Sequence, residues 1–255
     1  MQNMRIFTVL LIMIFLTPMI LNEAFGQELL ITISDAMEDV TFDGKWTIHT
    51  EWKRSSLNSM IFDNMPLHLR YAHQGNFIYF LIDFEGDTNL ENGKDKAMIC
   101  LNPKENFNPD EQFCFVAILN DDNSKVIMRT TNSEDFREIE RPEGFIAISS
   151  ASDEHDRYSR VPHSTYEFKI PTELVGRSSE YGFYFAVHEA NASKTFTYPS
   201  QVESITFDEI PDTSSWAKIV SPDKSLPEFH WIIVVVVSSF TFAIYLSRTR
   251  MMSGF

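Results

Sequence analysis

One short stretch of the chain is rich in oxygen-bearing side chains. Its oxygen donors, which follow a strand-like run, are Asp83, Asp87, Asn89, Glu91 and Asp95. Carboxylate and amide oxygens of this kind are the ligands that Ca²⁺ prefers. Asn92 stands where an EF-hand loop needs glycine, and no flanking helices are evident, so a helix-loop-helix site is not expected. We expect either a structural calcium site in a β loop or an ordinary solvated acidic turn.

No recognisable catalytic constellation accompanies these acids. The sequence contains no Gly-x-Ser-x-Gly, no His-Glu-x-x-His, no Gly-rich phosphate loop and no zinc-spaced Cys/His set. A glycosidase needs only two carboxylates about 5–9 Å apart, which a chain with 36 acidic residues leaves open. The absence of motifs and the small size of the chain favour a binding or structural protein over an enzyme, with no catalytic residues assigned.

The two cysteines, Cys100 and Cys114, lie in strand-like runs on either side of a stretch rich in Pro, Asn and Asp. That stretch is typical of a hairpin loop, so the thiols can face each other across neighbouring strands in an oxidising compartment. A thiol nucleophile is disfavoured because apolar neighbours would raise its pKa. We therefore predict a Cys100–Cys114 disulfide. Asn191 begins an Asn-Ala-Ser sequon, which is glycosylated only in an organism with that pathway.

Short apolar runs that alternate, or that are rich in β-branched and aromatic residues, recur along the whole body of the chain. They cover residues 29–33, 67–72, 77–84, 97–101, 113–119, 126–128, 145–148, 166–170 and 183–187. Long segments with a 3.6-residue period are absent outside the two termini. The pattern predicts an all-β fold, a two-sheet antiparallel β-sandwich of jelly-roll-like type, with one short helical turn at residues 171–176.

The charge of the body excludes one class of partner. The chain has a net charge of -15; Arg5 and Glu23 cancel before residue 27, and Arg248 and Arg250 follow residue 229, so residues 27–229 carry -17. Nucleic acid is therefore not an expected partner. An acidic surface suits solubility on a cell exterior or attraction of divalent cations.

Both ends of the chain carry targeting signals. Arg5, an apolar run at 6–21 and the small residues of Ala-Phe-Gly at 24–26 predict a signal peptide over residues 1–26, with an uncleaved anchor as the alternative. Residues 230–247 are uncharged and apolar and predict one transmembrane helix. Arg248 and Arg250 in the tail, 248–255, keep the C-terminus inside. Residues 27–220 then form one extracytoplasmic domain, joined to the membrane by a stalk at 221–229.

Several motifs occur in an order that suggests a family. They are Phe-Asp-Gly-Lys-Trp at 42–46 followed by Glu51-Trp52, Leu-Arg-Tyr-Ala-His-Gln-Gly-Asn-Phe-Ile-Tyr-Phe at 69–80, the acids at 83–87, Glu-Phe-Lys-Ile-Pro at 167–171, Gly-Phe-Tyr-Phe-Ala-Val at 182–187, and Trp216. Over roughly residues 30–220 they resemble the family-nine carbohydrate-binding modules and their relatives with the DOMON-like fold. The resemblance implies a β-sandwich that binds rather than cleaves, and in which calcium can brace the fold.

The resemblance also implies ligands. Sugar-binding modules stack aromatic rings on pyranose faces, and Trp46, Trp52 and Tyr71 are the candidates for that contact. Trp52 and Trp216 occupy positions that look structural in the family. Some relatives hold haem, for which this chain offers Met60, Met65, His68, His73 and Met98 as possible axial ligands. We favour a carbohydrate-binding surface module, for a glycan or cell-envelope polysaccharide, over a haem electron-transfer domain and a structural envelope protein without a small ligand.

The C-terminal segment has a resemblance of its own. Pro227, Glu228 and Phe229 directly precede the apolar span and its arginine-bearing tail, and this arrangement resembles the PEF-type sorting signals of archaeal surface proteins. In that family a membrane transpeptidase, archaeosortase, is thought to recognise the tripeptide. The resemblance implies that the helix is removed and the body is transferred to another anchor; the alternative is a plain membrane anchor.

Overall fold

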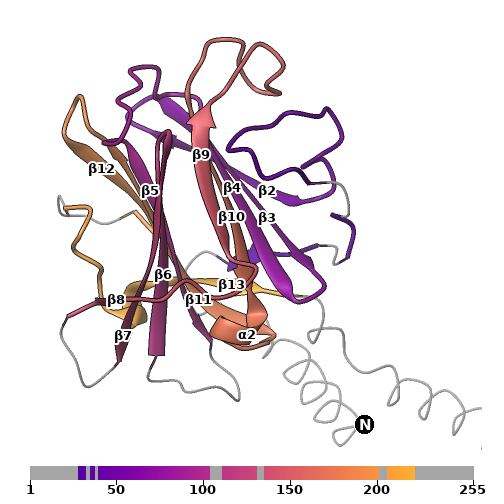
Figure 1. Cartoon of the computed structure of the whole chain (residues 1–255), viewed down its shortest axis with the longest axis vertical. Helices are drawn as coiled ribbons and strands as arrows, with labels where there is room; N and C mark the ends of the chain where they lie inside the picture. The colour runs from indigo at the N-terminus through magenta and orange to yellow at the C-terminus, as the bar shows by residue number, and fades with distance from the viewer. Residues whose placement is uncertain are drawn as a thin grey trace, which may run out of the picture.

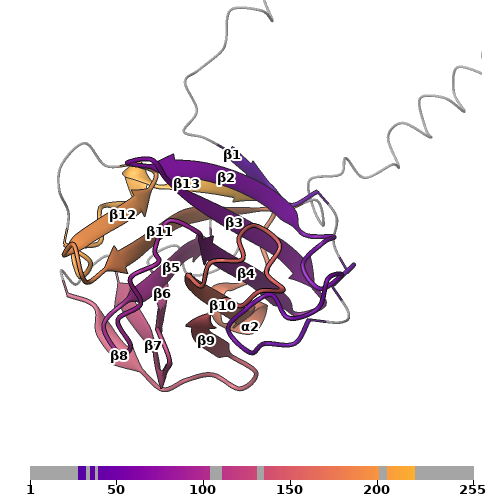
Figure 2. The ribbon, with the colours of Figure 1, turned by 90° about the horizontal axis from the view of Figure 1, so that it is seen from above.

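The computed structural model describes residues 28–32, 35–37, 40–103, 111–130, 135–200 and 206–221. Two β-sheets pack face to face (Figures 1 and 2). The larger sheet has the order β1 (Glu28–Leu30), β13 (Ala217–Val220), β11 (Glu180–Glu189), β5 (Lys96–Pro103), β6 (Glu111–Ile118), β7 (Asp121–Thr130) and β8 (Arg137–Ile139), and β12 (Lys194–Tyr198) also pairs with β11. The smaller sheet has the order β2 (Ser56–Phe62), β3 (Met65–Gln74), β4 (Phe77–Phe84), β10 (Ser164–Pro171) and β9 (Ile146–Ala151).

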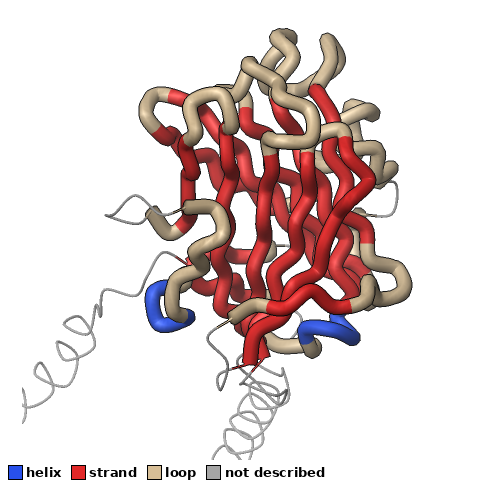
Figure 3. Tube along the Cα trace, turned by 60° about the vertical axis from the view of Figure 1, so that its left-hand side comes forward, coloured by secondary structure: helices blue, strands red, loops and turns tan. Residues whose placement is uncertain are grey.

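The chain passes from one sheet to the other four times, and every described strand pair is antiparallel except β1 with β13. The short helices α2 (Thr172–Val175) and η2 (Thr213–Ser215) lie toward one end of the strands (Figure 3). The segments that join β4 to β5 and β9 to β10 lie together at the opposite end (Figure 1). Side chains in these two segments are therefore brought close although they are distant in sequence.

Alternating side chains of the strands form the core between the sheets. In β4, Ile78, Phe80, Ile82 and Phe84 point inward, and Phe80 stacks on Phe183 of the opposite sheet at 5.5 Å between ring centroids. The residues between them face outward but are also buried, because the segment before β2 covers this face of the smaller sheet. Both faces of β4 are therefore covered by other parts of the chain, which explains why this strand is almost wholly apolar.

The predicted all-β sandwich is confirmed, and so is the helical turn after Pro171. Each predicted strand is present, but four others were missed: β2, β8, β12 and β13. β2 alternates buried or half-buried with exposed positions at the edge of its sheet, and its Ser and Asn residues weaken the apolar signal. The other three have five residues or fewer, too short for a period-2 pattern to stand out.

The predicted signal peptide, most of the stalk, the span, the tail and the tripeptide Pro227, Glu228 and Phe229 lie outside the described residues. Within the part of the chain that the structure describes, no helix is both long enough and apolar enough to cross a bilayer.

Candidate functional site

The Phe-Asp-Gly-Lys-Trp loop is hydrogen-bonded to a buried glutamate of β10. Glu167 accepts hydrogen bonds from the backbone N–H groups of Asp43 at 3.0 Å and Gly44 at 2.8 Å, and from Trp52 Nε1 at 2.8 Å. Burial raises the pKa of Glu167 to about 8, although the Gly44 and Trp52 donors act in the opposite direction. Glu51 in turn accepts from Thr41 N and Thr47 N. The motif therefore builds a fixed loop over the smaller sheet.

The three predicted sugar-stacking residues are all buried. Trp46, Trp52 and Tyr71 are exposed by only 2%, 0% and 3%. The Trp46 indole donates to Ile48 O at 2.7 Å and packs under the Arg70 guanidinium at 4.9 Å from the ring centroid, while Tyr71 faces the core between the sheets. In this conformation their rings serve packing, and a sugar would reach them only if these contacts opened.

The acidic stretch separates into two groups. Asp87 and Asp95 are buried, whereas Asn89 is exposed and Asp83 belongs to another cluster. Asp95 accepts from Glu91 N at 2.6 Å and from Ala190 N at 2.8 Å, which closes the turn. The predicted set of Asp83, Asp87, Asn89 and Asp95 is thus not assembled as one site.

Asp87 is the unusual member of this turn. Both of its carboxylate oxygens and Glu91 Oε2 are buried without a well-formed hydrogen bond to any described residue. Burial raises the pKa of Asp87 to about 7; the Ser164 hydroxyl lowers it, and the negative Asp95 and Glu189 raise it further. Buried carboxylate oxygens among several negative charges are unfavourable unless a proton or a hard cation such as Ca²⁺ is bound to them.

Asp83 lies instead with His163 and Asp156. Its Oδ1 is 2.8 Å from His163 Nε2, and Asp156 Oδ1 is 3.8 Å from the same nitrogen. Burial lowers the pKa of His163, but the hydrogen bond and charge of Asp83 outweigh it and raise the pKa to about 9. Burial raises the pKa of Asp83 to about 7 despite the neighbouring histidine. The sequence did not indicate His163 or Asp156, because both flank or lie in a loop with no regular pattern.

The outer face of the larger sheet carries the disulfide. Cys100 and Cys114 are directly opposite in the β5–β6 register and are joined, as predicted. Tyr184 of β11 lies in the same apolar cluster and stacks on Trp216 at 5.9 Å between centroids. Trp216 is 6% exposed, so its predicted core role is confirmed. The segment 206–216 therefore covers part of this face and continues into β13.

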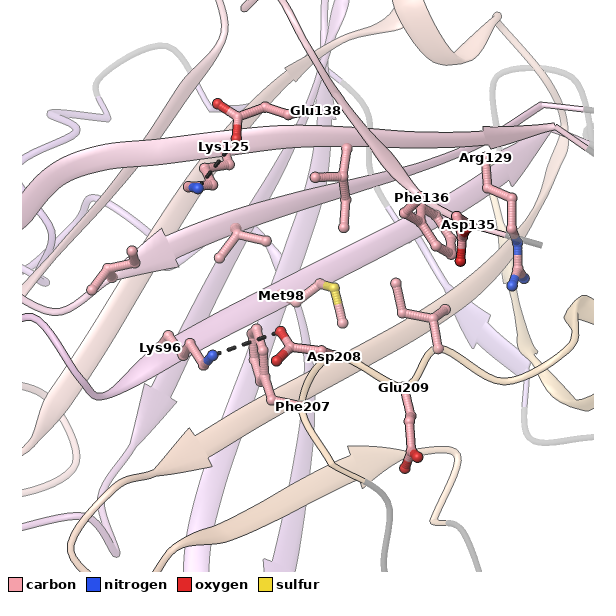
Figure 4. Close-up of a pocket in the computed structure, with 14 residues that line it drawn as sticks. Lys96, Met98, Lys125, Arg129, Asp135, Phe136, Glu138, Phe207, Asp208 and Glu209 are labelled. Atoms are coloured by element: carbon pink, nitrogen blue, oxygen red, sulfur yellow. Dashed lines mark ion pairs between the residues drawn. The ribbon is translucent and has the colours of Figure 1, made fainter. Parts of the chain in front are cut away.

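The same cluster forms the base of a groove of about 970 Å³ that runs across β5, β6 and β7 (Figure 4). Two aromatic rings line it: Phe207 from the segment before η2 and Phe136 from the segment before β8. In the view of Figure 4, Met98 lies between them on the floor. The apolar floor is completed by Val116, Ile118, Ile127 and Ile210. The groove thus combines an apolar base with two rings contributed by loops.

Charged side chains surround that base. They are Lys96, Lys125, Arg129, Asp135, Glu138, Asp208 and Glu209. Lys96 lies 4.3 Å above the Phe207 ring and 3.8 Å from Asp208, and Arg129 lies 4.5 Å from the Phe136 ring centre. The rim therefore carries positively charged hydrogen-bond donors and negatively charged acceptors, and its two cations Lys96 and Arg129 lie against aromatic rings.

The possible haem ligands are not gathered into one cluster. Met60 and Met65 pack against the core between the sheets, whereas Met98 belongs to the groove on the larger sheet. His68 stacks on Tyr158 and has Ser59 Oγ and Glu85 Oε2 within 2.9 and 3.3 Å of its two ring nitrogens. These four side chains thus lie on three different faces of the two sheets, and haem binding stays a prediction.

Comparison with known proteins gives a likeness of fold. No family model matches the chain, and no curated protein matches it significantly. A solved structure of a suggested carbohydrate-binding protein from Bacteroides uniformis is 10% identical, with a TM-score of 0.48 over 77% of this chain and 99% of that one. A family 9 carbohydrate-binding module from Caldicellulosiruptor kristjanssonii, solved with cellotriose, is 13% identical, with a TM-score of 0.42 over 79% and 98%. Its structure with glucose gives 12% and 0.43 over the same shares.

Sequence reasoning missed the residues of the groove. Phe136 and Phe207 each stand in polar surroundings, which are typical of loops. The only local signal is a large aromatic residue in an otherwise polar segment. No local sequence pattern shows that Phe136 and Phe207, which are 71 positions apart, line the same groove.

Proposed function

We propose that the body is a non-catalytic carbohydrate-binding module and that the glycan lies in the groove of the larger sheet. The observation that carries this proposal is the groove itself, in which the half-buried Phe136 and the edge of Phe207, 5% exposed, lie with a ring of charged groups around an apolar floor. A pyranose has C–H faces that pack on aromatic rings and hydroxyls that need donors and acceptors at the edge. The groove provides both in one place.

The volume of the groove fits a short saccharide. At about 970 Å³ it lies at the upper end of the range of small-ligand sites. Lys96 and Arg129 each cover one ring, so a sugar either uses the free ring edge or displaces a flexible cation. Both cations are half-buried, so each cation–ring contact contributes between about 0.5 and 2 kcal/mol, and a sugar face that replaces it must supply a comparable amount.

A glycan array with the detergent-purified full chain tests this proposal. Phe136→Ala is expected to lower the affinity for the retained glycan about tenfold, which corresponds to the ~1.4 kcal/mol of one ring contact. The matched control is Phe77→Ala, since Phe77 is also half-buried and has Lys169 at 4.2 Å from its ring centre, but lies on the other sheet. Equal losses in both variants would contradict the groove as the site of the glycan, and no retained glycan at all would support the envelope-protein alternative. Hydrolysis of the bound glycan would contradict the non-catalytic part.

We also propose that Ca²⁺ braces the turn of Asp87, Glu91 and Asp95. The buried carboxylate oxygens of Asp87 support it. Calcium at about 100 times its Kd would add ~2.7 kcal/mol to the stability of the folded chain. Asp87→Asn removes that shift yet stabilises the calcium-free protein, because it replaces a buried carboxylate by a neutral amide. Thermal unfolding with calcium and with chelator measures both effects, and a chelator-insensitive wild type would remove the calcium site.

The exported, membrane-anchored location remains part of the proposal and rests on the sequence of the two termini. Mass spectrometry of the protein from its native membrane decides between the anchors. A mature chain that begins at Gln27 and ends near Pro227 supports signal cleavage and sortase-type processing. A chain that ends at Phe255 supports a retained helix instead.

A further inference from the structure

A second cation site is suggested by the cluster of Asp83, Asp156 and His163, at the end of the sandwich away from α2. Asp83 is near the end of β4, His163 directly precedes β10, and Asp156 lies in the loop between β9 and β10. Their side chains are exposed by 0%, 1% and 0%. One ligand atom from each lies within 4.8 Å of the other two. The cluster is independent of the groove, so it does not rest on carbohydrate binding.

The hydrogen bonds of His163 fix which nitrogen faces the carboxylates. Nδ1 is 2.7 Å from the carbonyl oxygen of Val161, which can only accept, and 2.8 Å from Ser152 Oγ, which can donate or accept; the shorter contact with Val161 favours a hydrogen on Nδ1. Nε2 then points at Asp83 Oδ1 and Asp156 Oδ1. A lone pair on Nε2 would face two negative oxygens, so this nitrogen must hold a cation between itself and the acids. That cation is either a proton or a metal ion. A backbone carbonyl on the distal nitrogen is also the usual outer support of a metal-bound histidine.

The spacing of the three ligand atoms suits a small tetrahedral ion. Zinc bonds of about 2.0–2.1 Å place neighbouring ligand atoms about 3.3 Å apart. The two measured separations from His163 Nε2, 2.8 and 3.8 Å, lie on either side of that value. Little movement of side chains would be needed to admit the ion.

Spare oxygens provide an independent indication of a ligand. Asp83 Oδ2 and Asp156 Oδ2 are buried and accept no hydrogen bond from any residue that the structure describes. A proton on His163 offsets only one of the two carboxylate charges, whereas a divalent ion offsets both and can use the spare oxygens. One imidazole with two carboxylates is a donor set that suits zinc and its neighbours among the transition metals rather than calcium.

We propose that Asp83, Asp156 and His163 form a buried site for a divalent transition metal, with Zn²⁺ as the probe ion. The ion fastens the β9–β10 loop to β4. Asp156 already shapes that loop, since its Oδ1 accepts from Tyr158 N at 2.7 Å and Ser159 N at 3.1 Å. Tyr158 in turn stacks on His68 and accepts from Arg70, so metal at Asp156 orders a wider part of the outer face.

Equilibrium dialysis of the chelator-treated full chain with Zn²⁺, in excess Ca²⁺ to fill the acidic turn, tests the site. We expect one Zn²⁺ per chain and a rise in the unfolding temperature. Co²⁺ is expected to bind at the same site with visible absorption bands that Zn²⁺ abolishes. His163→Gln and Asp156→Asn should each lower the affinity more than about tenfold, because even changes to outer supports of a metal site cost about 10–100-fold.

Two controls separate this site from nonspecific or calcium-site binding. Asp153→Asn changes a half-buried acid of the same loop, which pairs with Lys45, and Asp87→Asn changes the acidic turn; both should retain the Zn²⁺ and Co²⁺ signals. A wild type that binds no stoichiometric Zn²⁺ or Co²⁺ would overturn the proposal and leave a protonated His163 with its acids. Folded His163→Gln protein with unchanged binding would overturn it as well. The wild-type stoichiometry decides even if a variant fails to fold.

Discussion

Replacement of Gly44 by alanine tests whether the Phe-Asp-Gly-Lys-Trp motif is structural. Gly44 has φ +87°, and a Cβ there would lie 2.6 Å from both the Ser149 carbonyl carbon and the Ser150 nitrogen of β9. The positive φ alone costs about 1–2 kcal/mol for alanine. To relieve the overlap, the loop must also move off β9 and weaken the 2.8 Å bond from Gly44 N to the buried Glu167, whose loss costs about 1–3 kcal/mol. Together these give a loss of ~2–5 kcal/mol.

For a body of this size each kcal/mol lowers the Tm by about 2–4 °C, so Gly44→Ala is expected to lower it by roughly 10 °C. Thermal unfolding followed by circular dichroism measures the change. Gly93→Ala is the matched control, because Gly93 also has a positive φ, +74°, but no atom lies within 4 Å of its added Cβ. That variant should lose only about 3 °C, from the backbone term alone. Similar losses in both variants would refute the assignment of a close backbone contact at Gly44.

Three further perturbations follow from the same contacts. The double variant Cys100→Ala, Cys114→Ala removes a disulfide that spans a sequence separation of 14, and it should lower the free energy of unfolding by ~3 kcal/mol; an unchanged urea midpoint would contradict this. Glu167 has a folded pKa of about 8 against an ordinary value of 4.5, so the folded state retains a proton that the unfolded chain releases. The free energy of unfolding of chelator-treated protein should therefore fall by a few kcal/mol from pH 5 to pH 8, and by less in Glu167→Gln. A free energy of unfolding that rises over this range would contradict the prediction. Trp46→Ala should destabilise the fold by about 3–5 kcal/mol, while the variant protein that does fold keeps its glycan affinity. A loss of glycan binding without a loss of stability would instead show that Trp46 contacts the ligand.

The predictions that succeeded depend on local pattern. Period-2 alternation of apolar residues identified β10, because alternate side chains of a strand must enter the same core wherever that strand lies in the sheet. A continuous apolar run identified β4, which is buried on both faces. The hairpin signal between Cys100 and Cys114 likewise fixed their pairing, since strands joined by a short loop are normally neighbours.

The predicted aromatic site shows that a sequence motif is not sufficient to assign a binding role to an aromatic residue. Sequence motifs marked Trp46 and Trp52 as important but could not separate a ring that packs from a ring that binds. That difference depends on what covers the ring: Arg70 lies over Trp46, and Trp52 donates to Glu167, 115 positions away. Solvent exposure is a property of the whole packed chain, so these roles emerged only in the structure.

The sequence by itself determined nine of the thirteen described strands, the sandwich, the disulfide and the acidic character of the body, because each follows from side-chain type and spacing over a few residues. Only the tertiary structure decided which polar groups meet. Asp83 and His163 are 80 positions apart, and they meet because β4 and β10 are neighbours in the smaller sheet. Phe136 and Phe207 share a groove because two loops border the same face of the larger sheet. Contacts of this range depend on sheet order, which the periodicity of single strands does not encode.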